Sequence, residues 1–336
     1  MGKLKIAVFE VTSEKEKEYL TSHLKNSEVS FFTDPLSLHN VQKVHDFDVV
    51  VVFIDSQVNQ DLLGKFTNLK LIATRSTGFD HIDTETCQKL NIAVCNVPHY
   101  GDNAVAEYTF ALLLDLSRKI HQSVTDVKNG GFSFKGFTGF DLNGKTLGIV
   151  GMGNIGQHVA RIAKGFEMKV IAYDPMQNKK LAKTVGFSYV TMEHLLGNSD
   201  IITLHVPYNK NTHHLINSDN IRSVKHGAYL INTARGGIIE TDALLGALSL
   251  GIVAGAGLDV LEEENFIKEE LQLLHKAGNS KVDYKTVLED HMLMELNNVI
   301  VTPHNAFNSK EALENILEIT VLNIQSFVKR KPINMV

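Results

Sequence analysis

The sequence predicts an α/β protein with two doubly wound parallel-sheet domains. Short apolar segments that suit buried strands alternate with segments of helical apolar spacing, which is typical of parallel sheets covered by helices. Four consecutive valines at residues 49–52 indicate a strand that is buried on both faces. A length of 336 residues suits about two such domains.

The first hundred residues contain the strands of one domain. A longer helix is predicted at 103–121, after Pro98 and the Gly101-Asp102 turn, and we interpret it as the crossing to the second domain. The apolar pattern predicts strands at 5–9, 29–32, 49–54, 69–74 and 92–97, and a helix at 14–24.

The second domain continues with further alternation and is followed by a terminal helix. Residues 262–298 interrupt it with a long charged segment that has two helical stretches around Gly278-Asn279, and such a segment has a structure or function of its own. The helical pattern at 310–329 should pack on the first sheet, which lacks one helix. The predicted domains are therefore 1–100 plus 304–336, which is discontinuous, and 101–303. The predicted strands are 147–150, 168–173, 201–206, 228–233, 253–259 and 299–302, with helices at 155–166 and 242–250.

Composition argues against several classes of protein. The net charge of −5 and the lack of a long basic block argue against a nucleic-acid-binding protein. No apolar run approaches the length of a membrane span, and residues 1–10 predict a strand rather than a signal peptide. Cys87 and Cys95 have no metal-ligand spacing around them, so we expect reduced thiols in a cytoplasmic protein without a metal site.

A glycine motif organises the second domain. Gly151, Gly153 and Gly156 form G-x-G-x-x-G between an apolar strand and an amphipathic helix, and a second strand ends at Asp174. In this dinucleotide-binding arrangement the glycines permit a tight turn, the approach of a pyrophosphate and the close packing of helix on strand. The free N–H groups at the helix N-terminus attract phosphate.

The acidic residue of the motif selects the cofactor. The carboxylate of Asp174 can accept hydrogen bonds from the adenosine ribose and would repel the 2′-phosphate of NADP. The sequence therefore predicts NAD. Lys179 and Lys180 follow the same strand and leave some use of NADP open.

Polar residues follow the strands of the second domain at the edge where parallel sheets bind ligands: His205, Arg235, Asp259 and His304. Arg235 stands between a strand and two glycines, with room to turn its guanidinium towards a carboxylate. Glu264 follows Asp259 by five residues, and a histidine paired with a carboxylate can donate a proton. Taken singly, a capping aspartate, a solvated glutamate and a surface histidine are the simpler explanations, so the grouping is what suggests a site.

In the first domain, residues 75–80 (RSTGFD) follow the carboxyl end of a strand. Backbone N–H groups exposed at Gly78 suit a carboxylate. An ordinary strand-to-helix turn accounts for the same residues, so both interpretations stay open.

Together these segments resemble the D-specific 2-hydroxyacid dehydrogenase family, and within it the D-lactate dehydrogenase-like branch. The resemblance covers almost the whole chain in the family's order. The matching segments are residues 76–83 (STGFDHID), 96–98 (NVP) with Tyr100, 103–107 (NAVAE), 151–156 (GMGNIG), 205–207 (HVP), 231–236 (INTARG), 257–260 (GLDV) and 302–304 (TPH).

The resemblance implies a flavodoxin-like substrate domain, a Rossmann NAD-binding domain, and reversible hydride transfer between NAD(H) and a small 2-keto or D-2-hydroxy acid. Pyruvate and D-lactate are the favoured pair. Arg235 would bind the substrate carboxylate and carbonyl, His304 would donate the proton, and Glu264 would hold and charge that histidine. Glu263 is the nearest alternative to Glu264. A homodimer packed around the helix at 103–121 is also implied.

Further roles follow from the same resemblance. The backbone of Thr77 and Gly78 would complete the carboxylate clamp, with Tyr100 and Phe53 in the substrate pocket. The implied cofactor contacts are Gly151, Gly153, Asn154, Ile155, Gly156, Asp174, His205, Val206, Pro207, Thr212, Thr233, Ala234, Arg235, Asp259 and His304.

Other functions stay open. A hydroxypyruvate or glyoxylate reductase of the same superfamily would keep the same residues. A formate dehydrogenase is disfavoured, because those enzymes carry glutamine where Glu264 stands. A non-catalytic NAD(H)-sensing protein, like the dehydrogenase-shaped transcriptional corepressors, can keep the three catalytic residues.

Overall fold

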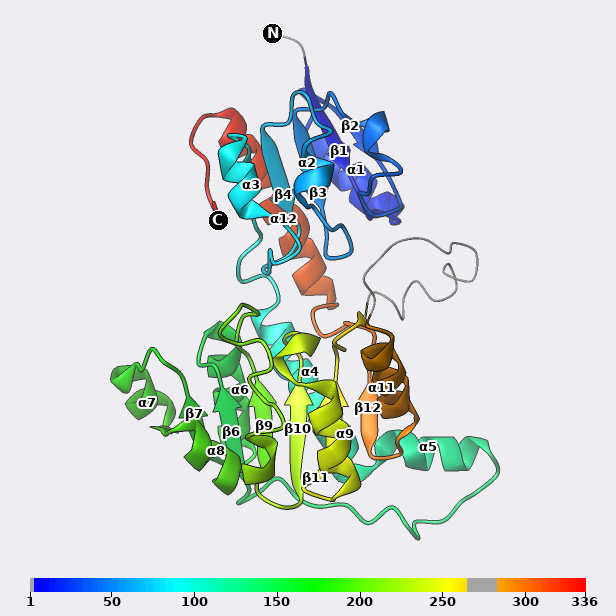
Figure 1. Cartoon of the computed structure of the whole chain (residues 1–336), viewed down its shortest axis with the longest axis vertical. Helices are drawn as coiled ribbons and strands as arrows, with labels where there is room; N and C mark the ends of the chain where they lie inside the picture. The colour runs from blue at the N-terminus through cyan, green and yellow to red at the C-terminus, as the bar shows by residue number, and fades with distance from the viewer. Residues whose placement is uncertain (1–2, 265–282) are drawn as a thin grey trace. The chain divides into compact units, whose positions relative to one another are not determined.

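The computed structural model describes residues 3–264 and 283–336. The chain divides into two compact units (Figure 1): unit 1 comprises Met1–Tyr100 and Ser309–Val336, and unit 2 comprises Gly101–Asn308. The second junction falls at Asn308 rather than at residue 303. The residues after 303 stay with unit 2 because the backbone N–H groups of Asn305 and Ala306 donate to a carboxylate of that unit.

Unit 1 contains a five-stranded parallel sheet in the order β2-β1-β3-β4-β5, which is the flavodoxin-like order. All five strands overlap the predicted ones. The four valines of β3 alternate between buried clusters on the two faces of the sheet, as expected of a central strand. The strands are β1 (Leu4–Val8), β2 (Ser27–Phe31), β3 (Val49–Val52), β4 (Leu71–Thr74) and β5 (Ala93–Cys95).

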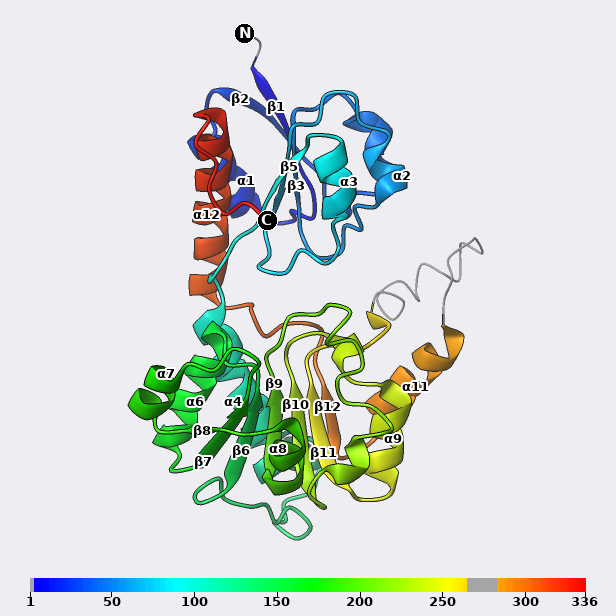
Figure 2. The ribbon, with the colours of Figure 1, turned by 60° about the vertical axis from the view of Figure 1, so that its left-hand side comes forward.

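Helices cover both faces of this sheet (Figure 2). On one face lie α1 (Glu14–His23) and α12 (Lys310–Val328), and on the other lie α2 (Gln60–Leu63) and α3 (Thr84–Lys89). The tail helix therefore packs on the N-terminal sheet, as its apolar pattern predicts. Burial of an aliphatic side chain of α12 that is almost completely enclosed, such as Ile324, stabilises this packing by roughly 1.5–3 kcal/mol.

Unit 2 contains a seven-stranded parallel sheet in the order β12-β11-β10-β9-β6-β7-β8, which includes the Rossmann order. The predicted strands are all observed. The short strand β8 and the helices α7 and α8 are not predicted from the sequence, because their residues lack a strong apolar pattern. The strands are β6 (Thr146–Val150), β7 (Lys169–Tyr173), β8 (Ser188–Tyr189), β9 (Ile201–Leu204), β10 (Ala228–Asn232), β11 (Val253–Leu258) and β12 (Val299–Val301).

The helices of unit 2 form two layers around the sheet. α4 and α6 pack against one face, while α8 and α9 pack against the other, with α11 against α9 and β12 (Figures 1 and 2). The helices are α4 (Asp102–Arg118), α5 (Ile120–Lys128), α6 (Asn154–Gly165), α7 (Lys179–Val185), α8 (Met192–Asn198), α9 (Thr241–Ser249) and α11 (Tyr284–Glu295).

Two predicted helical segments differ from the observed ones. The helix predicted at 103–121 ends at Arg118, because Lys119 adopts a left-handed conformation (φ 50°) and a separate helix begins after it. Of the two helical stretches predicted in 262–298, α11 is observed, and the other lies outside the described residues. No helix in the described ranges is both long and apolar enough to cross a membrane.

Candidate active site

The glycine turn between β6 and α6 has the geometry that its motif predicts. Gly151 has φ +96°, and a Cβ at this position would lie 2.7 Å from the carbonyl oxygen of His205. A Cβ on Gly156 would lie 2.1 Å from the carbonyl oxygen of Gly151, so helix and strand pack too closely for any side chain. A Cβ on Gly153 would meet no atom of another part of the chain within 4 Å, so this side of the turn is open for a phosphate at the N-terminus of α6.

Asp174 is fixed next to this turn. Its Oδ2 accepts the backbone N–H of Met152 at 2.7 Å, and its Oδ1 accepts the N–H of Met176 at 2.7 Å. Each carboxylate oxygen keeps a second lone pair that a ribose hydroxyl can use. The open turn and the anchored acid therefore fit the pyrophosphate and the ribose of NAD.

His205 follows β9 and remains neutral. Its Nε2 lies 2.9 Å from the hydroxyl oxygen of Thr203, and burial lowers the pKa of its ring to about 3. Its Nδ1 is buried without a hydrogen-bond partner in the described part of the chain. The loop that follows, with Val206 and Pro207, is closed by Thr212, whose hydroxyl donates to the Pro207 carbonyl at 2.6 Å.

Arg235 is carried by a turn that Asn232 holds at the end of β10. The Asn232 side chain donates to the Arg235 carbonyl at 2.9 Å and accepts the N–H of Ala234 at 3.0 Å. The guanidinium of Arg235 donates from Nη1 to the Ala234 carbonyl at 2.8 Å. Thr233 is tied to α4 through the hydroxyl of Thr109, at 3.1 Å.

His304 lies on a turn that Asp259 holds. The carboxylate of Asp259 is fully buried and accepts hydrogen bonds from the Thr302 hydroxyl (2.6 Å) and from the N–H groups of Asn305 and Ala306 (both 2.8 Å). Burial raises the pKa of Asp259, and these three hydrogen bonds oppose the rise. His304 itself has φ 54°, an uncommon conformation for a residue other than glycine. The observed bonds of Asp259 serve this turn, and its contact with the cofactor stays a prediction.

Glu264 contacts His304. The distance between Oε1 of Glu264 and Nδ1 of His304 is 2.8 Å, and both side chains are largely buried. Glu263, the alternative from the sequence, instead donates its backbone N–H to Asp290. The Nδ1 of His304 is thus engaged by a carboxylate, which leaves Nε2 as the nitrogen that can exchange a proton with a ligand.

Four of the predicted substrate residues belong to unit 1. The loop of Thr77 and Gly78 is held in place: the Asn96 side chain donates to the Thr77 carbonyl at 2.8 Å, and the Ser76 hydroxyl donates to the Gly78 carbonyl at 2.6 Å. Phe53 and Tyr100 are half-buried. The structure therefore brings Glu264 and His304 into contact in unit 2, which also contains Arg235, and places Thr77, Gly78, Phe53 and Tyr100 in unit 1.

Some residues that shape the site are not predicted from the sequence. Asn232 is one, although a polar residue at the last position of a buried strand is a signal that could have found it. Glu10 is another: its carboxylate accepts the N–H of Phe53 at 3.0 Å, and its backbone carbonyl accepts Arg75 at 2.6 Å. Glu10 has φ 58°, which no sequence pattern announces. In the described residues, no group of three or more His, Cys, Asp or Glu side chains could hold a metal ion.

Several known proteins are similar to this chain. The family "D-isomer specific 2-hydroxyacid dehydrogenase, NAD binding domain" matches residues 110–306. A 2-hydroxyacid dehydrogenase A of Aspergillus oryzae is 36% identical over 98% of this chain and 93% of its own length. A glyoxylate reductase of Thermococcus litoralis is 38% identical over 88% of this chain and 85% of its own.

Solved structures show the same relation. A D-lactate dehydrogenase of Aquifex aeolicus, in complex with NAD and lactic acid, superposes with a TM-score of 0.88 at 37% identity, over 97% of this chain and 96% of that one. The relatives thus differ in the acid that their names give. The chain carries the family's NAD-binding domain and belongs to the D-isomer-specific 2-hydroxyacid dehydrogenases, a family of oxidoreductases.

Proposed function

We propose that this protein reduces a small 2-keto acid to the D-2-hydroxy acid, with pyruvate and D-lactate as its pair, and that the reaction is reversible. The observation that carries the proposal is the 2.8 Å contact between Glu264 and Nδ1 of His304, in the same unit as Arg235 and the dinucleotide turn. The similarity of this chain to a D-lactate dehydrogenase that was solved with lactic acid supports the choice of pyruvate.

The proposed mechanism divides the work between three side chains. Bound NADH supplies the hydride. Arg235 binds the substrate carboxylate and polarises the carbonyl, because a guanidinium matches a carboxylate with two parallel hydrogen bonds. His304 gives the proton on Nε2 to the oxygen that becomes negative, and Glu264 stabilises the imidazolium before that transfer. In the reverse direction neutral His304 removes the proton.

Unit 1 supplies the rest of the proposed substrate site. The backbone N–H groups at Thr77 and Gly78 would bind the carboxylate, while Phe53 and Tyr100 would limit the size of the side chain. Among the NAD contacts proposed for unit 2, the glycine turn and Asp174 have the clearest geometry. The discontinuous unit 1 is thus the substrate domain of this proposal, and unit 2 is its cofactor domain.

A substrate comparison tests the proposal. Oxidation of NADH, followed at the nicotinamide absorbance, should be fastest in kcat/KM with pyruvate among pyruvate, glyoxylate and hydroxypyruvate. A higher kcat/KM with glyoxylate would favour the second candidate, a glyoxylate reductase, which the 38% identity to the Thermococcus litoralis enzyme supports. No turnover with any keto acid would overturn both.

We also propose that the protein is a homodimer that packs through the α4–α5 region. α5 buries none of its side chains, and Ile120, Val124 and Val127 are about half exposed. Phe132 and Phe134, four and six residues after the end of α5, are 93% and 88% exposed. Exposed apolar surface of this extent marks an interface. Light scattering should give a dimer for wild type and a monomer after Phe132→Glu and Phe134→Glu; a monomeric wild type would refute it.

We place the protein in the cytoplasm. Cys87 and Cys95 are free and buried, and burial raises the pKa of their thiols to about 11 and about 12. Unpaired buried thiols of this kind are typical of a reducing compartment.

A further inference from the structure

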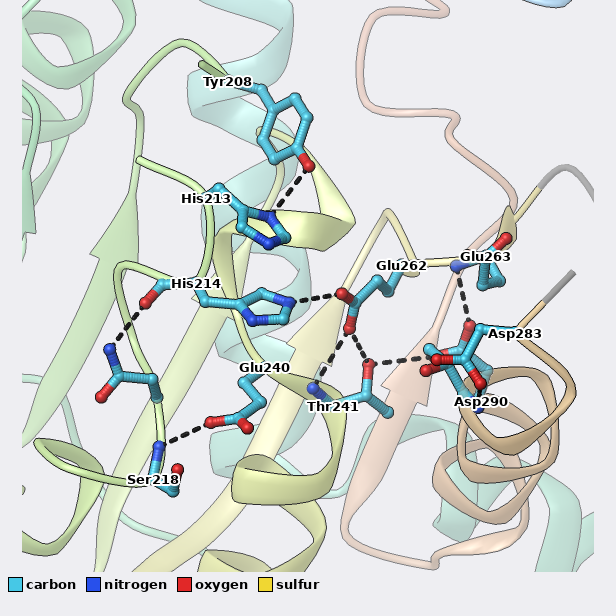
Figure 3. Close-up of polar contacts among 12 residues, drawn as sticks. Tyr208, His213, His214, Ser218, Glu240, Thr241, Glu262, Glu263, Asp283 and Asp290 are labelled. Atoms are coloured by element: carbon cyan, nitrogen blue, oxygen red, sulfur yellow. Dashed lines mark hydrogen bonds and ion pairs between the residues drawn. The ribbon is translucent and has the colours of Figure 1, made fainter. Parts of the chain in front are cut away.

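The segment that carries Glu264 is held by polar side chains that have no role in the mechanism above (Figure 3). Both carboxylate oxygens of Glu262 are engaged. Oε1 contacts Nε2 of His214 at 2.5 Å, and Oε2 accepts the hydroxyl and the N–H of Thr241 at 2.9 and 3.3 Å. The residue two positions before Glu264 is therefore tied to the start of α9 and to the loop after β9.

The next residue is tied from another direction. Asp290, on α11, is completely buried, and its Oδ2 accepts the backbone N–H of Glu263 at 3.1 Å. Oδ1 of Asp290 lies 3.5 Å from the hydroxyl of Thr241, which therefore stands between the carboxylates of Glu262 and Asp290. Since that hydroxyl carries one proton, it can donate to only one carboxylate at a time. Three separate elements thus converge on residues 262 and 263.

The turn that carries Arg235 packs on the same segment. A Cβ on Gly236 would lie 2.0 Å from the carbonyl carbon of Leu261 and 2.4 Å from the nitrogen of Glu262, so the two backbones are in direct contact. Gly237 accepts the backbone N–H of His214 at 2.8 Å. A displacement of residues 261–263 would therefore disturb Arg235 as well as Glu264.

Burying these acids is costly unless the network has a use. Burial, together with the negative charges of Glu262 and Glu263, raises the pKa of the Asp290 carboxyl to about 7, although the N–H of Glu263 opposes this. A well-packed apolar group in place of such a buried acid is often neutral or stabilising. What an apolar side chain cannot do is accept the N–H of Glu263.

We propose that His214, Glu262 and Asp290 are positioning residues, which hold Glu264 at hydrogen-bond distance from Nδ1 of His304 and so keep His304 able to donate its proton. This inference rests on the proposed function, because it gives the network a task in that reaction. It assigns no contact with substrate or cofactor to these three side chains.

The test measures the titration of His304 directly, without substrate. The C2–H resonance of His304 in protein labelled at histidine is assigned by its loss in His304→Gln. Glu264→Gln sets the full effect of losing the carboxylate, a midpoint lower by about one pH unit. Asp290→Ala should lower the midpoint by about half of this or more, because Glu264 is no longer held against the ring.

Two variants separate positioning from charge and from general disturbance. Asp290→Asn removes the charge but keeps an oxygen that can accept the N–H of Glu263, so its midpoint should stay at the wild-type value. Glu240→Ala is the matched control: it removes a carboxylate one residue from Thr241, but that carboxylate accepts the N–H of Ser218 at 2.7 Å, away from residues 261–264 (Figure 3). It should also leave the midpoint unchanged.

Each outcome has one meaning. A wild-type midpoint in Asp290→Ala overturns the proposal, and so does a shift in Asp290→Asn as large as in Asp290→Ala. Loss of NADH binding in a folded Asp290→Ala would make the network an element of the fold alone. If Asp290→Ala does not fold, His214→Ala takes its place. This change removes the contact between His214 and Glu262 and should likewise lower the titration midpoint of His304. A wild type without keto-acid turnover would refute the proposed function, whereas the titrations would still decide on the positioning role.

Discussion

Replacing Asp290 with asparagine should make the stability of the protein less dependent on pH. The folded-state pKa of Asp290 is raised from 3.8 to about 7, with burial as the main cause. The folded protein therefore holds this proton more tightly than the unfolded chain. The resulting stabilisation is fully present below about pH 4 and is lost as the pH rises through about 7.

The magnitude follows from the two pKa values. Each pH unit between them changes the free energy of unfolding by about 1.4 kcal/mol. From pH 5 to pH 7 the wild type should therefore lose about 2 kcal/mol that Asp290→Asn, which is neutral throughout, does not lose, because Asp290 is already half ionised in the folded protein at pH 7. Above pH 7 the difference should level off, because Asp290 is then ionised in both states.

The assay is urea unfolding of wild type and Asp290→Asn, followed by far-ultraviolet circular dichroism at pH 5, 6, 7 and 8. The quantity of interest is the difference between the two proteins at each pH, because titrating groups that do not interact with Asp290 cancel in it. Glu240→Gln serves as the control for the loss of a carboxylate next to Thr241 that does not contact residues 261–264. A constant difference for Asp290→Asn would mean that Asp290 ionises in the folded protein as it does in the unfolded chain, and the argument from burial would fail.

Three further predictions concern the active site. Asp174 should make NADH preferred over NADPH by on the order of tens-fold in kcat/KM, since a like-charge contact with the 2′-phosphate costs roughly 2 kcal/mol where it is partly desolvated; equal values would refute this. Arg235→Lys keeps the charge but loses the paired hydrogen bonds, so the KM for the keto acid should rise and kcat should fall steeply while the Kd for NADH stays nearly unchanged. Wild-type kinetics would remove Arg235 from the site. Glu264→Gln should move the alkaline limb of the reduction profile to lower pH by roughly one unit and impair oxidation much less; an unmoved limb would assign the partner of His304 elsewhere.

The fold could be predicted to the extent that it depends on local pattern. The four valines of β3 indicate a strand, and the glycines around Gly153 indicate a turn. Both signals act on the residues next to them in the sequence, so they can be recognised without the fold. The break after Arg118 could not be predicted, because nothing in the residue type of Lys119 indicates a left-handed conformation.

The same distinction applies to the site. Arg235 and His304 follow predicted strands, and parallel strands bring their carboxyl ends to one edge, so short-range spacing was enough to group them. The contacts of Glu262 with His214 and of Glu263 with Asp290 join residues 48 and 27 positions apart through loops and a helix. No periodicity links such residues, and without the fold Glu262 is one more acid in a charged segment.

The split of unit 1 has a consequence for synthesis of the chain. α12 follows the whole of unit 2, yet it covers the face of the N-terminal sheet that includes Ile6 and Val49. During translation α1 alone covers part of that apolar face until α12 has left the ribosome, whereas unit 2 is made from one continuous stretch. Exposed apolar surface on a partly made domain promotes aggregation. Unit 1 is thus begun before unit 2 and completed after it, and the nascent sheet of unit 1 is the stage at which a chaperone would matter most.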